Sequence, residues 1–582
     1  MPSLSLRTVL ALAAMGSVAV AAPPGDSLLH KLLGEHAILE QVVAPSAWKL
    51  AGKPHPESPM KLQIALKQSD ITGLQAKLND IADHNSPNYG KWLSKGEVDA
   101  FTAPDVKGIE AITGWLKAAG IADSAISQPS ADWMHVEIPV GKAEKLLQAN
   151  YGMYNHDDHE DSLMRTLAYA IPEGLHQHIE TIQPTTSFLY NTAKRPSGIQ
   201  PKPQHVRRRG GMSDCATAAS PDCVRQLYNV DFKGQGLSSG AVVVFNRDTA
   251  STSDLAKYLK EYDPKVPSGT KYTEVFIGNA TTKPKLNNME PNLDTQMLVS
   301  LSYPNPASMI HAGPDDRLDR FFEDLLSLTD YINNHSNPPR VVSMSYSGDE
   351  PKQAHPYYER ICNEFSKATA RGVSFFMSSG DNGVGPSNNQ CTTFRPTFPS
   401  GCQYITVVGA TGITSDGTGE VAAKFEFIEN GTSGGGFSNL FPAPDFQSAN
   451  TSAYISNYVP ASYDGKYNKT GRGYPDVAML GKNLNIIFKG KEYLAEGTSA
   501  SSPIFAALIA QINDMRAANN KTSLGWLNPR LYTDVAVRAA MRDITSGNNA
   551  NCDTNGFTAE AGWDPVTGLG TFDFAALRKA FA

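Results

Sequence analysis

Four short, almost wholly apolar runs constrain the fold of the C-terminal two-thirds of the chain. Runs of this length are typical of parallel strands buried on both faces of a sheet. Because amphipathic stretches of helical length lie between some of them, the pattern predicts an α/β domain with a doubly wound parallel sheet. The apolar runs cover residues 241–245, 341–345, 373–377 and 404–408, and the helical stretches include residues 320–332 and 357–370.

The preceding residues, 57–190, predict a separate and smaller α+β unit. Residues 60–67 and 132–140 alternate apolar and polar side chains, as half-buried strands do. Residues 71–82, 106–119 and 142–150 have helical patterns. This order predicts a small antiparallel sheet with helices on one face.

A basic, proline-containing segment joins the two units. Residues 194–209 hold no acidic residue, and they carry the basic residues Lys194, Arg195, Lys202, Arg207, Arg208 and Arg209. Such composition predicts an exposed linker. One interpretation is a simple connector. The other is a pair of processing sites, Lys194-Arg195 and Arg207-Arg208-Arg209, whose cleavage would make the N-terminal unit a propeptide.

The N-terminus indicates export. Arg7 precedes an apolar run over residues 9–20, and Ala21 and Ala22 follow it, which predicts a secretory signal peptide. The run is well short of the roughly 20 residues that span a membrane. No later segment of that length lacks charge, so we expect a soluble, extracellular protein without membrane contact. The formal net charge of −7 argues against nucleic acid as a partner.

Cysteines and glycosylation sequons agree with export. All six cysteines lie beyond residue 212, and we expect Cys215 and Cys223 to pair locally while the other pairings stay open. Asn-x-Ser/Thr sequons begin at Asn279, Asn334, Asn430, Asn450, Asn468 and Asn520.

The strongest local motif places a serine at the entrance of a helix. Residues 496–503 read EGTSASSP, and an apolar helical stretch follows over residues 504–515. Gly497 permits a tight turn, and the helix N-terminus offers free N–H groups beside the Ser499 hydroxyl. A bare Gly-Thr-Ser is more often a helix cap. The longer pattern, Gly-Thr-Ser-Ala-x-x-Pro, resembles the nucleophile signature of the subtilisin-like fold.

A serine nucleophile needs a base, and the usual histidine is missing. After residue 205 the chain has only His311, His335 and His355, none in a His-Gly-Thr motif, and we interpret all three as lone surface residues. Glu290 and Asp294 are the alternative. They are four residues apart on a predicted helix, so both carboxylates share one face. Such a pair usually faces solvent, but when held close it retains a proton.

A further acidic residue follows the apolar run 373–377. Asp381 lies in the sequence Ser-Ser-Gly-Asp-Asn-Gly and therefore at the carboxyl end of a predicted strand. Alone it would be a turn residue. In the subtilisin fold this position carries the side chain that binds the oxyanion, and an aspartate can donate that hydrogen bond only when protonated.

Together these motifs resemble the sedolisin family of serine-carboxyl peptidases. The resemblance rests on Glu-x-x-x-Asp, Ser-Gly-Asp and Gly-Thr-Ser-Ala-x-x-Pro in that order, with SPNYGKWL at residues 86–93 similar to the family's propeptide. It implies that Ser499 is the nucleophile, Glu290 the general base, Asp294 its partner and Asp381 the oxyanion residue. The implied divisions are a signal peptide (1–22), a ferredoxin-like α+β activation propeptide (23–193), a linker (194–212) and a subtilisin-like catalytic domain (213–582).

The resemblance also implies a structural calcium ion and a mode of action. The calcium ligands would be the carboxylates of Asp543 and Asp564 and the carbonyls of Ile544, Glu560 and Gly562. The substrate would lie between residues 343–347 and 433–436, and Asp476 would be structural. We expect a monomeric zymogen that acts on peptides and proteins below about pH 6 and is inhibited by its own propeptide. Release of N-terminal tripeptides is favoured over endopeptidase cleavage, and a non-catalytic binding protein is the remaining alternative.

Overall fold

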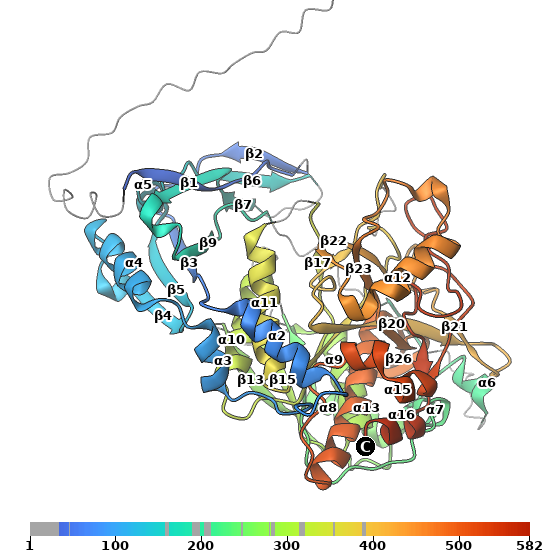
Figure 1. The fold of residues 1–582 in the computed structure, drawn as a ribbon. Coiled ribbons are helices and arrows are strands. Elements are labelled where there is room, and N and C mark those ends of the chain that lie inside the picture. The colour runs from blue at the N-terminus through green and yellow to red at the C-terminus, as the bar shows by residue number, and fades with distance from the viewer. Residues whose placement is uncertain are drawn as a thin grey trace, which may run out of the picture.

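The computed structural model describes residues 34–45, 47–157, 162–188, 198–202, 211–245, 248–278, 280, 286–313, 321–352, 355–386 and 391–582. The predicted signal peptide, the basic pairs of the linker and the sequon at Asn279 lie outside these residues. Figure 1 shows two units, with the blue to cyan elements on one side and the green to red elements on the other.

The larger unit is built on a central sheet that has eight strands within the described residues. All its pairings are parallel except that of β21, which is antiparallel to β20. The four apolar runs form four adjacent strands of this sheet, which confirms the predicted doubly wound parallel core. In spatial order, the strands are β13 (Thr273–Ile277), β15 (Ala307–Ala312), β11 (Gly240–Val244), β16 (Val341–Met344), β18 (Ser374–Ser378), β20 (Ile405–Ile413) and β21 (Glu420–Ala422), with β24 (Val477–Leu480) also beside β20.

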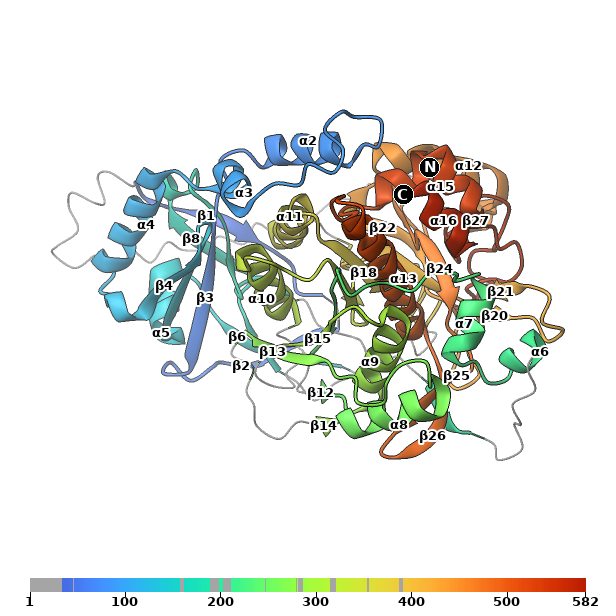
Figure 2. The same cartoon turned by 90° about the horizontal axis from the view of Figure 1, so that it is seen from below.

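Helices cover both faces of this sheet because its strands are apolar on both. Val242 and Val244 belong to the hydrophobic core that contains α9 (Met289–Ser302) and α13 (Thr498–Ala518). Ala241 and Val243, on the opposite face of the same strand, belong to the core that contains α10 (Phe321–Asn334) and α11 (Pro356–Ala370). Figure 2 shows α9 and α13 side by side across the sheet from α10 and α11.

Shorter elements complete the larger unit. A three-stranded sheet places β26 between β10 and β25, and β26 leads directly into α13. The remaining elements are β10 (Gly198–Pro201), α6 (Met212–Cys215), α7 (Pro221–Leu227), β12 (Asp248–Thr249), α8 (Thr252–Tyr262), β14 (Leu286–Asn287), β17 (Gly348–Asp349), β19 (Thr397–Phe398), β22 (Gly436–Pro442), α12 (Asp445–Tyr458), β23 (Gly471–Tyr474), β25 (Leu484–Phe488), β26 (Lys491–Glu496), α14 (Asn528–Thr533), α15 (Val535–Ala540), β27 (Met541–Arg542), β28 (Thr571–Phe572) and α16 (Phe574–Ala580).

The N-terminal unit is the predicted α+β domain. Its main sheet is antiparallel, in the order β4-β5-β3-β9, and α4 and α5 share a hydrophobic core with one face of it. The predicted helix 71–82 matches α2, and the helix expected at 142–150 begins slightly earlier, at Val140. The elements are β1 (His36–Gln41), β2 (Trp48–Gly52), β3 (Pro59–Leu66), α2 (Ile71–Ala82), α3 (Lys95–Thr102), α4 (Val106–Ala118), β4 (Ile126–Ser130), β5 (Trp133–Pro139), α5 (Val140–Leu147), β6 (Gly152–His156), β7 (Ser162–Arg165), β8 (Ala168–Pro172) and β9 (Ile179–Gln183).

The N-terminal unit is held against α11 by buried charges. Arg360 is fully buried and lies 2.7 Å from Asp132 and 3.0 Å from Glu180, both of the N-terminal unit. Lys367, about two turns further along the same face of α11, lies 2.9 Å from the same Asp132 carboxylate. These opposite charges hold the pKa of Asp132 well below its usual range although burial raises it. The contact is therefore a specific, charge-matched interface.

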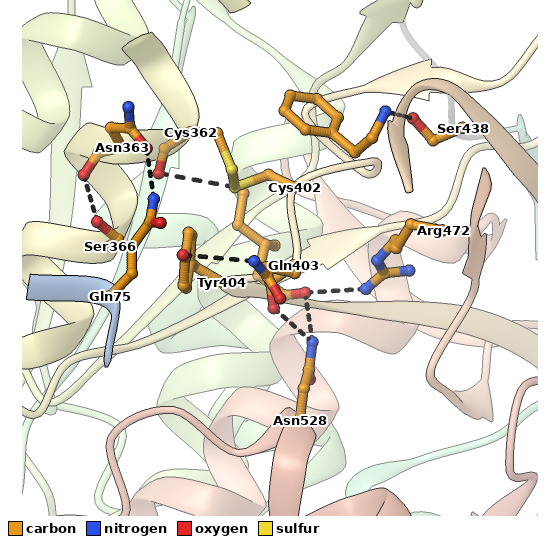
Figure 3. Close-up of a disulfide and its surroundings, with 12 residues drawn as sticks. Gln75, Cys362, Asn363, Ser366, Cys402, Gln403, Tyr404, Ser438, Arg472 and Asn528 are labelled. Atoms are coloured by element: carbon orange, nitrogen blue, oxygen red, sulfur yellow. Dashed lines mark hydrogen bonds between the residues drawn. A yellow bond between two sulfur atoms is a disulfide. The ribbon is translucent and has the colours of Figure 1, made fainter. Parts of the chain in front are cut away.

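Three disulfides tie the larger unit together. Cys215 pairs with Cys223, as predicted, and the others join Cys362 to Cys402 and Cys391 to Cys552. Figure 3 shows the second of these, which links α11 to the segment before β20. Among the described residues, no helix is both long and apolar enough to cross a membrane.

Candidate active site

Ser499 is the second residue of α13, which begins directly after β26. The N-cap, Gly497, has φ 147° and ψ 158°, a conformation that favours glycine, so the strand can turn sharply into the helix. Ser499 is fully buried, and its hydroxyl has no hydrogen-bond partner among the described residues. The Ser499 hydroxyl therefore lies at the start of the helix without a hydrogen bond to another described residue.

Glu290 and Asp294 lie on α9, whose residues are all buried. Asn288 caps the helix, and the two carboxylates are one turn apart. Burial and the neighbouring charge of Glu290 raise the pKa of Asp294 well above its usual range. The Ser345 hydroxyl donates to Asp294 Oδ1 over 3.1 Å and opposes that shift in part. Burial beside Glu290 therefore favours the protonated form of Asp294.

Asp381 follows β18 and is buried. Its Oδ1 accepts two hydrogen bonds from Thr498, one from the N–H at 2.7 Å and one from the hydroxyl at 2.8 Å. Burial raises the pKa of Asp381 to about 7, although the Thr498 bonds lower it. Asp381 Oδ2 has no hydrogen-bond partner among the described residues. Below about pH 7 this carboxyl is thus a neutral group with a proton to donate.

Hydrogen bonds bring the elements that carry these residues together. Asp381 is bonded to Thr498, the neighbour of Ser499. Asp294 is bonded to Ser345 just after β16, and Ser343 within β16 lies 2.9 Å from Ser502 on α13, oxygen to oxygen. These hydrogen bonds join α9 to the end of β16, β16 to α13, and the loop after β18 to α13, so the elements that carry the predicted residues meet at the carboxyl ends of these strands.

The expectation of surface histidines is wrong for two of the three. His311 is buried, and its Nε2 lies 3.0 Å from Glu274. His355 is almost wholly buried at the interface with the N-terminal unit, where its Nε2 lies 3.2 Å from Glu40. His335 is half-buried at the end of α10. His311 and His355 are covered by residues that are distant in the sequence, so the local sequence could not show their burial.

The glycine-rich segment expected to flank the substrate packs tightly on the protein itself. The N–H of Gly434 donates to the carbonyl of Gly380 over 2.7 Å. A Cβ atom at Gly434 would lie 2.5 Å from the Ser379 carbonyl oxygen, and one at Gly435 would lie 2.1 Å from that of Pro565. These glycines therefore let one wall of the site approach both the Asp381 loop and the 560–568 loop.

A buried glutamate that the motifs did not single out joins residues that follow the two segments expected to flank the substrate. Glu350 follows β17, and its carboxylate accepts from the Ser438 hydroxyl at 2.7 Å and from the Asn439 N–H at 2.5 Å. Burial raises its pKa to about 8.

Thr498 and Ser345 were also missed as partners, because their contacts join residues far apart in the chain. Asp476, interpreted as structural, is buried and paired with Arg472 at 2.6 Å.

The loops expected to bind calcium lie against each other. Asp543 Oδ2 accepts from the Gly562 N–H at 2.7 Å, and Asp564 Oδ2 accepts from the Glu560 N–H at 3.2 Å. Asp564 is fully buried, and burial raises its pKa to about 8. The donors to Asp564 are amides and the Thr567 hydroxyl. Since a buried carboxylate without a cation is unfavourable, these residues fit a bound cation.

Comparison with known proteins matches both units of the chain. Residues 46–188 match the family model described as Pro-kumamolisin, activation domain, and residues 318–569 match the model described as Subtilase family. Pseudomonas sedolisin, a serine-carboxyl proteinase, aligns with a TM-score of 0.50 and 21% identity over 62% of this chain and 97% of its own. The fold and these matches define a subtilase-fold serine peptidase that carries its activation domain.

Relatives of greater sequence similarity narrow the class to a family. Tripeptidyl-peptidase SED4 of Arthroderma otae is 30% identical, with 100% of this chain and 99% of that protein covered. Tripeptidyl-peptidase sed4 of Aspergillus fumigatus is 32% identical, covering 92% and 94%, and aorsin of Aspergillus oryzae is 29% identical over the same shares. The chain belongs to the sedolisin family of serine-carboxyl peptidases.

Proposed function

We propose that the mature protein is a secreted, acid-active peptidase that releases tripeptides from the free N-termini of peptides through an acyl-enzyme on Ser499. The single observation that supports this most is Asp381, a buried carboxyl of raised pKa that is hydrogen-bonded to the residue beside Ser499. An oxyanion site that must be protonated suits acid and not neutral conditions.

In the proposed mechanism, Ser499 Oγ attacks the scissile carbonyl carbon while Glu290 takes the hydroxyl proton. The proton on Asp381 Oδ2 forms a hydrogen bond to the oxyanion of the tetrahedral intermediate. Asp294 keeps its proton, because burial and Glu290 raise its pKa, and so leaves Glu290 as the charged base of the pair. Glu290 then gives its proton to the leaving amine, and water hydrolyses the acyl-enzyme.

Tripeptide release is supported by two relatives named as tripeptidyl-peptidases, which match over nearly their whole length. We propose that residues 23–193 form an activation propeptide that assists folding and inhibits the enzyme, and that the catalytic domain spans residues 213–582. Removal of the signal peptide (1–22) and cleavage within the linker (194–212) would give a monomeric, glycosylated extracellular enzyme. The buried charges at α11 support a propeptide that stays bound until it is cleaved.

We also propose that one calcium ion stabilises the catalytic domain. Asp543 and Asp564 would supply carboxylate oxygens, and Ile544, Glu560 and Gly562 would supply carbonyl oxygens. Among the described residues, no group of three or more His, Cys, Asp or Glu side chains is arranged so that it could hold a metal ion. Backbone carbonyls would therefore provide most of the ligands. The ion would neutralise Asp564 and hold the 560–568 loop, against which Gly435 packs.

The test compares a free-N-terminus peptide with its N-acetylated twin at pH 4 and pH 7, with the Ser499→Ala variant as the blank. Tripeptide release from the free peptide only, and only at pH 4, is the expected result. Internal cleavage of both peptides would instead make the protein an endopeptidase with the same catalytic residues. Absence of any Ser499-dependent cleavage would contradict the proposal and favour a binding protein on this fold.

A further inference from the structure

The outer edge of β26 is covered by a strand from the segment that connects the two units. β10 pairs with it in antiparallel register, from Gly198 opposite Glu496 to Pro201 opposite Tyr493. β25 pairs with the other edge of β26. Without β10, β26 would thus present an open edge to which an extended peptide can add.

The direction of β10 indicates which part of a peptide this edge suits. β26 ends at Glu496, three residues before Ser499. Because the pairing is antiparallel, β10 begins at the end of β26 nearest Ser499 and runs away from it. In a bound substrate, the chain that runs away from the nucleophile towards its own C-terminus is the part beyond the scissile bond. β10 therefore lies in the orientation of the leaving part of a substrate.

A site for a positively charged side chain lies at the far end of the same edge. Lys202 Nζ is 3.5 Å from Glu492 Oε2, donates to the Tyr262 hydroxyl over 3.2 Å, and lies 4.7 Å from the centre of the Tyr262 ring. The Tyr262 hydroxyl in turn donates to Glu492 Oε2 over 2.6 Å. The Lys202 side chain is only 13% exposed. A carboxylate beside an aromatic face is the pairing that binds a basic side chain. Figure 2 shows β26 next to α8, the helix that ends at Tyr262.

We infer that the outer edge of β26, with Glu492 and Tyr262 at its end, binds the substrate chain on the C-terminal side of the scissile bond and prefers a basic side chain there. In the precursor β10 occupies this site, with Lys202 in the place of the substrate's basic residue. The inference rests on the proposed function, since it takes Ser499 as the nucleophile.

Peptides with one constant N-terminal tripeptide and a varied C-terminal extension test the inference. Lysine, or glutamine as its neutral match, is placed in turn at each of the second to seventh positions after the scissile bond. The processed wild type is expected to cleave the lysine peptide with about two- to fivefold higher kcat/KM at one position, the size expected for a partly exposed ion pair. The Glu492→Gln variant is expected to lose that preference, and Tyr262→Phe to weaken it.

A tripeptide anilide without an extension is the matched control. Ser499-dependent cleavage of this anilide shows that each protein is folded and active, and the lysine preference of each protein is taken from its own lysine and glutamine peptides. Failure of Ser499-dependent anilide cleavage would refute the proposed function. Normal anilide cleavage without a lysine preference at any position, or with the same preference in Glu492→Gln, would overturn the inference alone.

Binding of the linker peptide gives a readout that needs no catalysis. Fluorescence polarisation measures a labelled Gly-Ile-Gln-Pro-Lys peptide, the sequence of residues 198–202, on processed wild type and Glu492→Gln. Weaker binding to the variant is expected, and equal binding would overturn the inference. The mature chain must also begin after Lys202, because β10 would otherwise stay on the edge. N-terminal sequencing of a mature chain that starts before Gly198 would likewise overturn it.

Discussion

Thr498 donates both its N–H and its hydroxyl to the same oxygen of Asp381, over 2.7 and 2.8 Å. The hydroxyl oxygen of Thr498 in turn accepts from the N–H of Gly380 at 3.1 Å. Since Asp381 Oδ1 already accepts two hydrogen bonds, the acid proton belongs on Oδ2, which has no partner among the described residues. Thr498 thus fixes which oxygen of Asp381 can donate to an oxyanion.

Replacing Thr498 by valine should lower kcat by about tenfold, the effect of one lost hydrogen bond in an oriented site. KM should change little, because the lost bond orients a group that acts in the transition state. The alkaline limb should also move to higher pH, since the Thr498 hydroxyl lowers the pKa of Asp381. Thr498→Ser keeps the hydroxyl, so its kcat and the position of the alkaline limb of its pH–rate profile should match those of wild type. If valine and serine behaved alike in pH–rate profiles, the positioning role would be wrong.

Glu350 should make the protein less stable as pH rises. Its pKa is raised from 4.5 to about 8 by burial, so the folded state holds a proton that the unfolded chain loses between these values. Each unit of such a shift corresponds to about 1.4 kcal/mol of unfolding free energy. Glu350→Gln, which cannot ionise, should therefore unfold at a higher temperature than wild type at pH 8 and at a similar temperature at pH 4. Calorimetry at both pH values is the check. If the difference in melting temperature between Glu350→Gln and wild type were the same at pH 4 and pH 8, the assignment would be wrong.

Chelation should loosen the wall of the active site that carries Gly435. The 560–568 loop contacts this wall through Val566, whose carbonyl accepts from the Ser433 hydroxyl at 3.0 Å. With EDTA we expect a lower melting temperature and loss of activity, both restored by calcium. Asp564→Asn should melt at the same temperature with and without calcium. Asp553→Asn, in a neighbouring loop, is the control and should respond like wild type. A calcium response retained in Asp564→Asn would place the ion elsewhere.

The buried charges on α11 should control how long the precursor persists. Asp132→Asn removes the carboxylate that Arg360 and Lys367 share across the contact, although Glu364 on α11 stays beside both cations. Removing one member of a buried ion pair usually lowers stability by about 3–5 kcal/mol. The variant precursor should therefore convert to the mature form faster, as followed by electrophoresis at acid pH. Asp123→Asn, at an exposed ion pair with Lys117, should convert at the wild-type rate. Equal rates for all three would mean that this cluster does not limit conversion.

The four central strands could be predicted because each run is apolar at nearly every position, as a strand buried on both faces must be. The four candidate residues could be singled out from the sequence, since Glu290 with Asp294, Asp381 and Ser499 each lie in a local motif. The sequence could not predict the bonds between motifs, such as Thr498 to Asp381 across 117 residues, because tertiary packing alone creates them. The burial of His311 and His355 was missed for the same reason, since each is covered by residues from other elements.

The central claim is that a protonated Asp381 supports attack by Ser499. The most direct test is the pH dependence of kcat/KM for tripeptide release by the mature protein, from pH 3 to pH 9, with Ser499→Ala as the blank. Because Asp381 has a pKa of about 7 and must be neutral, activity should be high in acid, decline through about pH 6 to 7 and vanish at higher pH. A Ser499-dependent activity that stayed constant from pH 4 to pH 8 would contradict the account.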